Sequence, residues 1–168
     1  YVPVSFSVEG ENIWAYVTKM RAHDEPIGYV VYKYDDINWI RKDERDDPIL
    51  INTIPQKLTD NRIIVGGRMA LNPGEKPLIP IIAQSEIYKN EPAKWEITKL
   101  LGPWNHDEFK LQCPETAVAV NNDSIHVYVR NDVGPAQYYH SEDFGNEWNG
   151  PYDCLLPIGR SKIYAGCL

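Results

Sequence analysis

The chain has 168 residues, which is enough for one domain with a buried core. Its formal net charge of −7 disfavours nucleic acid and anionic membrane surfaces as partners, because both require a basic surface. No apolar run reaches about 18 residues, so the sequence predicts no membrane span. The 13 prolines, 11 glycines, 11 tyrosines and 5 tryptophans favour short strands and turns over helices.

Three segments of the chain align as repeats. In residues 4–17, 54–67 and 116–129, a short alternating apolar run leads into a polar turn of Asn, Asp or Gly and then into a second β-rich run. This pattern is typical of a β-hairpin. The aligned isoleucines, which stand 50 and 62 residues apart, are Ile13, Ile63 and Ile125.

Each hairpin is followed by a further extended run, a polar turn and a tryptophan. These tryptophans, Trp39, Trp95 and Trp148, are 56 and 53 residues apart. Four short strands per repeat are what a propeller blade requires. A β-sandwich is the alternative, but it does not explain a tryptophan at the same point in each repeat. The sequence therefore predicts an all-β fold, a β-propeller of four-stranded antiparallel blades, with approximate blades at residues 1–50, 51–112 and 113–168.

Three blades do not close a ring, since propellers have about four to eight. We therefore expect residues 1–168 to be one partial domain, an internal segment of a larger, six-bladed ring. The first residue is Tyr1 rather than Met, and the chain ends just after a new β-like run at residues 162–166. Both observations favour further blades outside this sequence.

Residues 141–148 carry a motif with four defined positions. They read Ser-Glu-Asp-Phe-Gly-Asn-Glu-Trp, which matches S-x-D-x-G-x-x-W. Ser and Asp side chains bind the backbone of a tight turn, Gly adopts a positive φ, and Trp packs against the sheets. The motif resembles the Asp box, or BNR repeat, of the sialidase (neuraminidase) superfamily. In that family it marks the fold and takes no part in catalysis.

Three further stretches resemble the same family in the same order. They are residues 58–68, residues 114–120 with the arginine that follows them, and residues 161–168 with their tyrosine. The resemblance implies an exo-α-sialidase-like glycosidase that is secreted or periplasmic, although no signal-peptide pattern opens the chain. The implied substrate is terminal sialic acid or a related acidic sugar.

The family holds its substrate carboxylate with arginines from different blades and attacks with a tyrosine that a glutamate activates. Arg68 and Arg130 both lie five residues after an aligned isoleucine, so we expect them in the same slot of adjacent blades. Thr18 holds this slot in the first repeat. The alternative interpretation is that both arginines form surface or inter-blade salt bridges.

The resemblance leaves two assignments open. Glu115 lies 15 residues before Arg130, as expected if Arg130 is the middle clamp arginine; the nucleophile would then follow Leu168. Tyr164 lies 34 residues after Arg130, as expected if Arg130 is the last clamp arginine; the glutamate slot then holds Thr53. The predicted site comprises Tyr164 and Glu115 as catalytic residues and, as substrate-binding residues, Arg68, Arg130 and His140.

Cofactor motifs are absent from the sequence. No nucleotide-binding or zinc-protease motif is present, and the histidines have no metal-ligand spacing, so we expect neither cofactor nor metal. The sequence has three cysteines: Cys113, Cys154 and Cys167. Because this number is odd, at least one of them is unpaired within this sequence.

Two other functions fit the same predicted pocket. A sialidase-like propeller could act as a polysaccharide lyase, with arginines neutralising a uronic acid and a histidine or tyrosine removing the adjacent proton. A propeller without acid and nucleophile would be a carbohydrate-binding module. All three predict an acidic glycan as the partner, and the fold alone does not choose among them.

Overall fold

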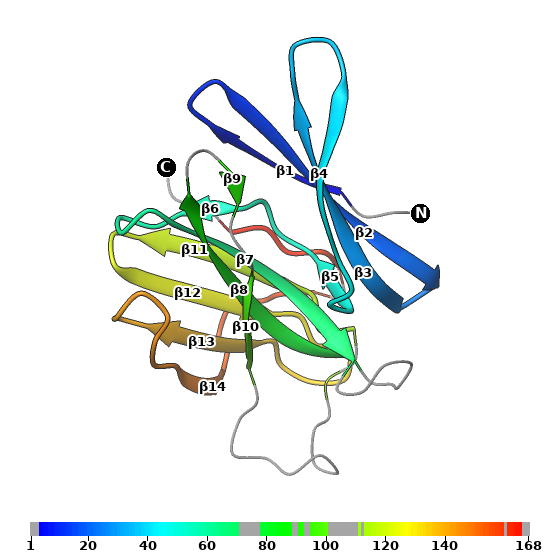
Figure 1. The fold of residues 1–168 in the computed structure, drawn as a ribbon. Coiled ribbons are helices and arrows are strands. Elements are labelled where there is room, and N and C mark those ends of the chain that lie inside the picture. Colours follow the sequence, from blue (N-terminus) through cyan, green and yellow to red (C-terminus); the bar gives the residue numbers. More distant parts are fainter. Residues whose placement is uncertain are drawn as a thin grey trace.

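The computed structural model describes residues 4–70, 78–88, 91–92, 95–100, 111, 113–159 and 161–165. Every regular element in these ranges is a β-strand, and no helix occurs among them, so the predicted all-β class is confirmed (Figure 1). The described residues accordingly contain no helix of the length and hydrophobicity that a membrane crossing needs.

The strands form three antiparallel sheets that follow one another along the chain. The first sheet contains β1 (Val4–Glu9), β2 (Asn12–Ala22), β3 (Glu25–Tyr34) and β4 (Trp39–Arg45). The second contains β5 (Ile49–Ile51), β6 (Gln56–Lys57), β7 (Arg62–Ala70), β8 (Leu78–Tyr88), β9 (Glu91–Pro92) and β10 (Glu96–Lys99). The third contains β11 (Thr116–Asn121), β12 (Ser124–Val129), β13 (Gln137–Ser141) and β14 (Asn149–Asp153).

Each sheet is a meander in which strands adjacent in sequence pair with each other. The first and third sheets run β1-β2-β3-β4 and β11-β12-β13-β14. The second has the path β10-β8-β7-β5, with β6 also on β7 and β9 also on β8. Each of the three predicted hairpins therefore lies in a sheet of its own: β1 pairs with β2, β6 with β7, and β11 with β12.

The edge strand of the second sheet is split into two pieces, which the sequence did not predict. Between β5 and β6, the backbone amides of Asn52 and Thr53 both donate to the carbonyl of Gly66, at 2.9 and 3.3 Å. Two residues thus face one residue of β7, as in a β-bulge. Pro55 has no amide hydrogen to continue the ladder. β5 therefore ends at Ile51, before the bulge, and β6 resumes the pairing with β7 at Gln56.

The second sheet is buried on both faces. One face of β7 and β8 packs on the first sheet in a cluster that includes Ile63, Val65, Ile81, Trp14 and Tyr16. The other face packs on the third sheet in a cluster that includes Ile64, Ile82, Val118, Ile125 and Val127. Because adjacent residues of a strand point to opposite faces, two-sided burial explains the uninterrupted apolar runs of these two strands.

The three repeat tryptophans occupy the predicted equivalent position, at the start of the last main strand of each sheet. Trp39 opens β4, while Trp95 and Trp148 directly precede β10 and β14. Their environments differ. Trp95 is 4% exposed and lies 5.5 Å from the ring of Tyr16, Trp148 is half-buried, and Trp39 is 45% exposed beside Phe6.

The turn between β13 and β14 contains the hydrogen bonds expected from its motif. The Ser141 hydroxyl donates to Asp143 Oδ1 at 2.7 Å and accepts from the Gly145 amide at 2.8 Å. Trp148 Nε1 donates to the Gly145 carbonyl at 3.0 Å. Asp143 also accepts the amide of Glu147 at 2.9 Å, and this bond is the main cause of the lowered pKa of Asp143. The motif therefore acts as a self-contained turn.

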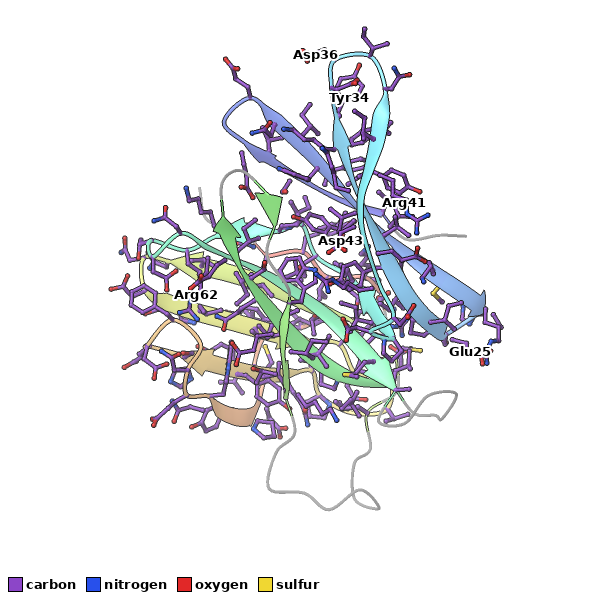
Figure 2. The ribbon with its side chains drawn as sticks, viewed as in Figure 1. Glu25, Tyr34, Asp36, Arg41, Asp43 and Arg62 are labelled. Atoms are coloured by element: carbon purple, nitrogen blue, oxygen red, sulfur yellow. The ribbon has the colours of Figure 1, made fainter. Side chains whose placement is uncertain are left out.

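The second sheet holds this turn in place. Arg62, at the start of β7, donates from Nη2 to the carbonyl of Phe144 at 3.0 Å (Figure 2). Gln84 of β8 donates to the same carbonyl at 2.6 Å. Phe144 has a positive φ of 60°, which aims its carbonyl at both donors. These contacts fix the third sheet against the second at this end.

Candidate functional site

The outer face of the third sheet carries a cluster of tyrosines and histidines. In the strand register, Tyr128, Tyr138 and Tyr152 stand opposite one another on β12, β13 and β14, and His126 stands opposite His140. The alternate residues of β12 are fully buried against the second sheet. The tyrosines and histidines therefore lie on the opposite face. We call this set the aromatic face: His126, Tyr128, Tyr138, His140 and Tyr152.

Tyr138 is the centre of the aromatic face. Its ring centroid lies 5.3 Å from that of Tyr128 and 6.4 Å from that of Tyr152. The rings of His126 and His140 stack with it at interplanar angles of 12° and 15°. His126 Nδ1 lies 2.7 Å from the Tyr138 hydroxyl, and burial is the main cause of the raised pKa of Tyr138. The two groups form a hydrogen-bonded acid–base pair on a flat aromatic surface.

His140 is the one predicted site residue within the aromatic face. Its ring stacks on Tyr138 and on Tyr152, at centroid distances of 5.6 and 6.0 Å. Its Nδ1 atom is buried and has no hydrogen-bond partner among the residues that the structure describes. An unpartnered buried nitrogen costs free energy.

Arg130 and Glu115 continue the β11–β12 ladder beyond the aromatic face. The Arg130 amide donates to the Glu115 carbonyl at 2.8 Å, which extends the register by one pair and puts both side chains on the aromatic side. Arg130 Nη1 donates to Glu115 Oε2 at 2.8 Å. Nε and Nη2 donate to both oxygens of Asp132, at 2.7 and 2.9 Å. The Asp132 contact is the main reason why the pKa of Arg130 is raised.

Tyr164 lies at a cavity beside the same face. The cavity measures about 400 Å³. Its lining includes Ala117, Ala119 and Tyr128 from the sheet and, from the C-terminal segment, Leu156, Ile158 and Tyr164. Because Ala117 stands opposite Tyr128 in the register, this cavity adjoins the aromatic face. Tyr164 is 80% exposed, and no hydrogen bond joins its hydroxyl to Glu115 in the described part of the chain.

Arg68 lies apart from these residues, on β7 of the second sheet. Its Nη2 donates to Asp24 Oδ1 at 2.9 Å, in the turn between β2 and β3. The side chain is only 11% exposed, and its Nε atom is buried and has no hydrogen-bond partner among the described residues. Thr18, in the same slot of the first sheet, is fully buried. Arg68 and Arg130 thus each form a salt bridge, with Asp24 and with Glu115, and their role in binding a substrate carboxylate stays a prediction.

The structure thus brings four of the five predicted site residues to one side of the third sheet: Glu115, Arg130, His140 and Tyr164. Sequence reasoning missed the other members of the aromatic face. The available signal was the spacing of two residues between His126 and Tyr128 in β12 and between Tyr138 and His140 in β13. In a strand this spacing places both rings on the same face.

Two of the three cysteines, Cys113 and Cys154, are free thiols, and Cys167 lies outside the described residues. Within the described ranges, no group of three or more His, Cys, Asp or Glu side chains could hold a metal ion.

Comparisons with known proteins add little to this description. No family model matches the chain, and no curated protein matches it. Among solved structures, an exo-β-1,3-galactanase from Clostridium thermocellum is similar with a TM-score of 0.40 and 10% sequence identity. The similarity covers 89% of this chain and 47% of the galactanase, so the chain spans about half of that structure. A similarity this low establishes neither a common fold nor a common activity.

Proposed function

We propose that this chain is part of a carbohydrate-active β-propeller that binds an acidic glycan around Arg130, where the β11–β12 ladder ends. The observation that carries the proposal is the guanidinium group of Arg130, which Glu115 and Asp132 hold beside the rings of the aromatic face. Flat rings offer apolar surface for a sugar ring, and the tyrosine and histidine edges offer hydrogen bonds to its hydroxyls. A guanidinium group matches a carboxylate in shape and charge.

The stacking of the sheets supports the propeller part of the proposal. Ile63 packs toward the first sheet and Ile125 toward the second, so the aligned residue faces the preceding sheet in both cases. Four-stranded meanders that stack in chain order and in one direction are the arrangement of propeller blades. A sandwich brings two inner faces together instead.

The paired state of Arg130 indicates how an acidic sugar would bind. Asp132 holds Nε and Nη2 from one side and so orients the guanidinium group. Glu115 holds only Nη1. On this proposal the ligand carboxylate takes the place of Glu115 at Nη1, while Asp132 keeps the group in position.

A sialidase-type hydrolase is the first reaction that fits this arrangement. In the assignment with Tyr164 as nucleophile, the family's glutamate position holds Thr53, so Glu115, once the ligand displaces it from Arg130, would accept the Tyr164 proton in its place. Tyr164 would then attack the anomeric carbon: the bond from this carbon to the aglycone oxygen breaks, a covalent glycosyl–tyrosine intermediate forms, and the departing oxygen takes a proton from water. What supports this candidate is the place of Tyr164 at the cavity next to the aromatic face.

A polysaccharide lyase is the second reaction, and the 2.7 Å contact between His126 and Tyr138 favours it. One of these groups would remove the proton adjacent to the uronic carboxylate, and the other would donate a proton to the departing oxygen. A site that binds but does neither would be a carbohydrate-binding module.

The test is a titration of the protein with a sialoside, a polyuronate and a neutral glycan, followed by NMR chemical shifts. We expect the acidic glycans to bind and to shift the signals of the aromatic face. Arg130→Lys keeps the charge but loses the two-bond contact with Asp132 that orients the guanidinium group, so it should weaken the binding of acidic glycans by roughly 1–3 kcal/mol and leave a neutral glycan unaffected. Equal binding of acidic and neutral glycans would contradict the proposal.

Activity assays separate the two reactions. A fluorogenic sialoside reports hydrolysis, and the absorbance of an unsaturated uronate reports elimination. Tyr164→Phe should abolish the first activity only, whereas His126→Ala should abolish the second only. If Tyr164→Phe leaves sialoside hydrolysis unchanged, the tyrosine nucleophile is wrong.

A further inference from the structure

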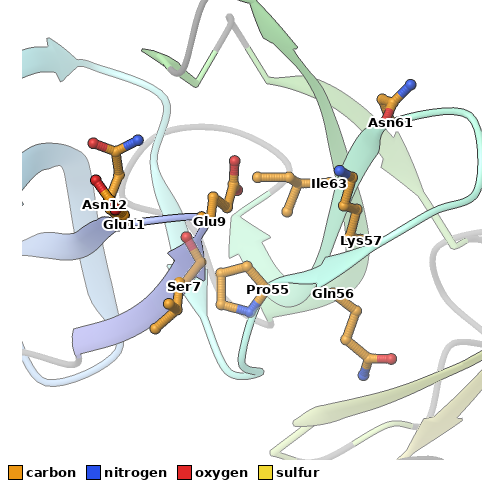
Figure 3. Close-up of a pocket in the computed structure, with 11 residues that line it drawn as sticks. Ser7, Glu9, Glu11, Asn12, Pro55, Gln56, Lys57, Asn61 and Ile63 are labelled. Atoms are coloured by element: carbon orange, nitrogen blue, oxygen red, sulfur yellow. The ribbon is translucent and has the colours of Figure 1, made fainter.

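A second polar cleft lies between the first and second sheets, at the end where the β1–β2 hairpin turns. It measures about 750 Å³, within the size range of small-ligand sites. One wall is residues 7–12 of that hairpin, and the other is formed by residues 55–57, Asn61 and Ile63. We call it the hairpin cleft. Figure 1 shows the β1–β2 hairpin diverging from β6 at this end, and Figure 3 shows the lining side chains.

The two walls face each other with opposite charges. In Figure 3, Glu9 extends from the first wall and Lys57 from the second, with Ile63 between them and Pro55 beneath. Gln56 points away from this space, because its amide binds the backbone of β11 at Val118 and Val120. The cleft is therefore a separate space from the junction of the second and third sheets.

Five polar side chains of the hairpin cleft form no hydrogen bond or ion pair within the described residues. Within the described part of the chain, none of the following makes a side-chain hydrogen bond or an ion pair: Glu9, Glu11, Asn12, Lys57 and Asn61. Elsewhere the structure pairs its carboxylates, for example Glu25, Glu44 and Asp60 with nearby cations. Polar groups that converge on a cleft without satisfying one another are typical of a binding site.

The charge of the cleft selects the kind of ligand. Glu9 and Glu11 carry two negative charges and Lys57 one positive charge, which leaves an excess of one negative charge. Glu9 is half-buried, and the burial raises its pKa despite the opposing effect of Lys57. A cation beside Glu9 would replace the hydration that this carboxylate has lost.

From this geometry we infer that the hairpin cleft binds an amine-bearing sugar of the hexosamine class. The ammonium group pairs with Glu9. The side-chain amides of Asn12 and Asn61 offer donors and acceptors to the ring hydroxyls. Ile63 and Pro55 supply an apolar surface for the C–H face of the ring. This site is independent of the acidic-glycan site on the aromatic face.

The test is an NMR titration with glucosamine, glucose and glucuronate as probes. We expect glucosamine to shift the signals of residues 7–12 and 55–61, glucose to bind about tenfold more weakly, and glucuronate not to bind there. Glu9→Gln keeps the shape and removes the charge, so it should weaken glucosamine about tenfold and bring it to the level of glucose. The matched control is Glu96→Gln, an exposed carboxylate on the opposite edge strand of the second sheet, which should have no effect.

The glucosamine titration tests the hairpin cleft separately from the acidic-glycan site. No glucosamine binding, equal binding of glucosamine and glucose, or unchanged binding in Glu9→Gln would overturn it. Shifts confined to the aromatic face would also overturn it, because that site is on the third sheet. Failure of the acidic glycans to bind would instead contradict the proposed function and leave the hairpin cleft untouched.

Discussion

At the end of the aromatic face, Arg130 is held by Glu115 and Asp132, whereas in the hairpin cleft Glu9 and Lys57 face each other without an ion pair. A paired and half-buried charge is fixed in orientation, but a ligand has to displace a partner to reach it. A ligand reaches an unpaired charge without displacing a partner. The first kind of site contributes to the stability of the fold, and the second contributes little.

The largest expected effect is at the paired site. Arg130→Met leaves the carboxylates of Glu115 and Asp132 without their cation, and each is only about one-sixth exposed, at 17% and 16%. We expect the free energy of unfolding, measured by urea denaturation, to fall by about 2–4 kcal/mol. Lys19→Met, which breaks the more exposed pairs with Glu44 and Asp46, is the control and should cost about 1 kcal/mol or less. If both variants lost the same free energy of unfolding, the Arg130 pairs would be no more stabilising than an exposed pair.

The turn that supports the aromatic face should come next. Ser141→Ala removes the acceptor of the buried Gly145 amide and the donor to Asp143. We expect a loss of about 1–3 kcal/mol in the free energy of unfolding, because a buried amide then lacks a partner. Thermal unfolding followed by circular dichroism measures it. A loss below that of an ordinary exposed serine would mean that the turn is held by its other bonds alone.

Glu9→Gln should change stability very little. The Glu9 carboxylate makes no ion pair in the described structure, so its removal costs no partner. We expect a change within about 0.5 kcal/mol in the free energy of unfolding at neutral pH, with a slight gain from removing a half-buried charge. A marked loss of stability would show that Glu9 is a structural residue, and the contrast between the two sites would not hold.

The pH dependence sharpens the contrast further. Burial raises the pKa of Glu9 above its ordinary 4.5, so its contribution to stability is present at low pH and is lost as pH rises through the raised value. Hydrogen bonds lower the pKa of Asp143 below its ordinary 3.8, so its contribution is present above that pH and is lost on further acidification. For each variant, Glu9→Gln and Asp143→Asn, the difference in the free energy of unfolding from the original protein can be plotted against pH. We expect the two plots to have opposite slopes. Parallel curves would contradict these assignments.

Local sequence patterns predicted much of the fold. The three hairpins and the positions of Trp39, Trp95 and Trp148 followed from alternation and turn residues, which act within a few neighbours. The hydrogen bonds of the Ser141–Trp148 turn followed from the side chains of the motif itself. The split of β5 from β6 was not predicted, because it depends on where β7 offers the Gly66 carbonyl.

The candidate sites were less predictable for the same reason. Glu115 and Arg130 were expected together from their spacing, and the register of β11 and β12 brings them into an ion pair. His126 and His140 were not connected with Tyr138 or Tyr152, because a cross-strand row forms only after the strands pair. The hairpin cleft joins residues about fifty positions apart, on two sheets, and no local pattern marks it.

The sequence by itself determined the all-β class, the repeat of hairpin and tryptophan, and the closed turn before β14, since each depends on alternation or on side chains within one turn. Only the tertiary structure decided which charges are paired and which are free. Arg130 is paired because the ladder ends beside Glu115 and Asp132, and Glu9 is free because the first hairpin diverges from the second sheet. Packing between sheets sets these distances, and electrostatic interactions depend on distance and burial rather than on order in the chain.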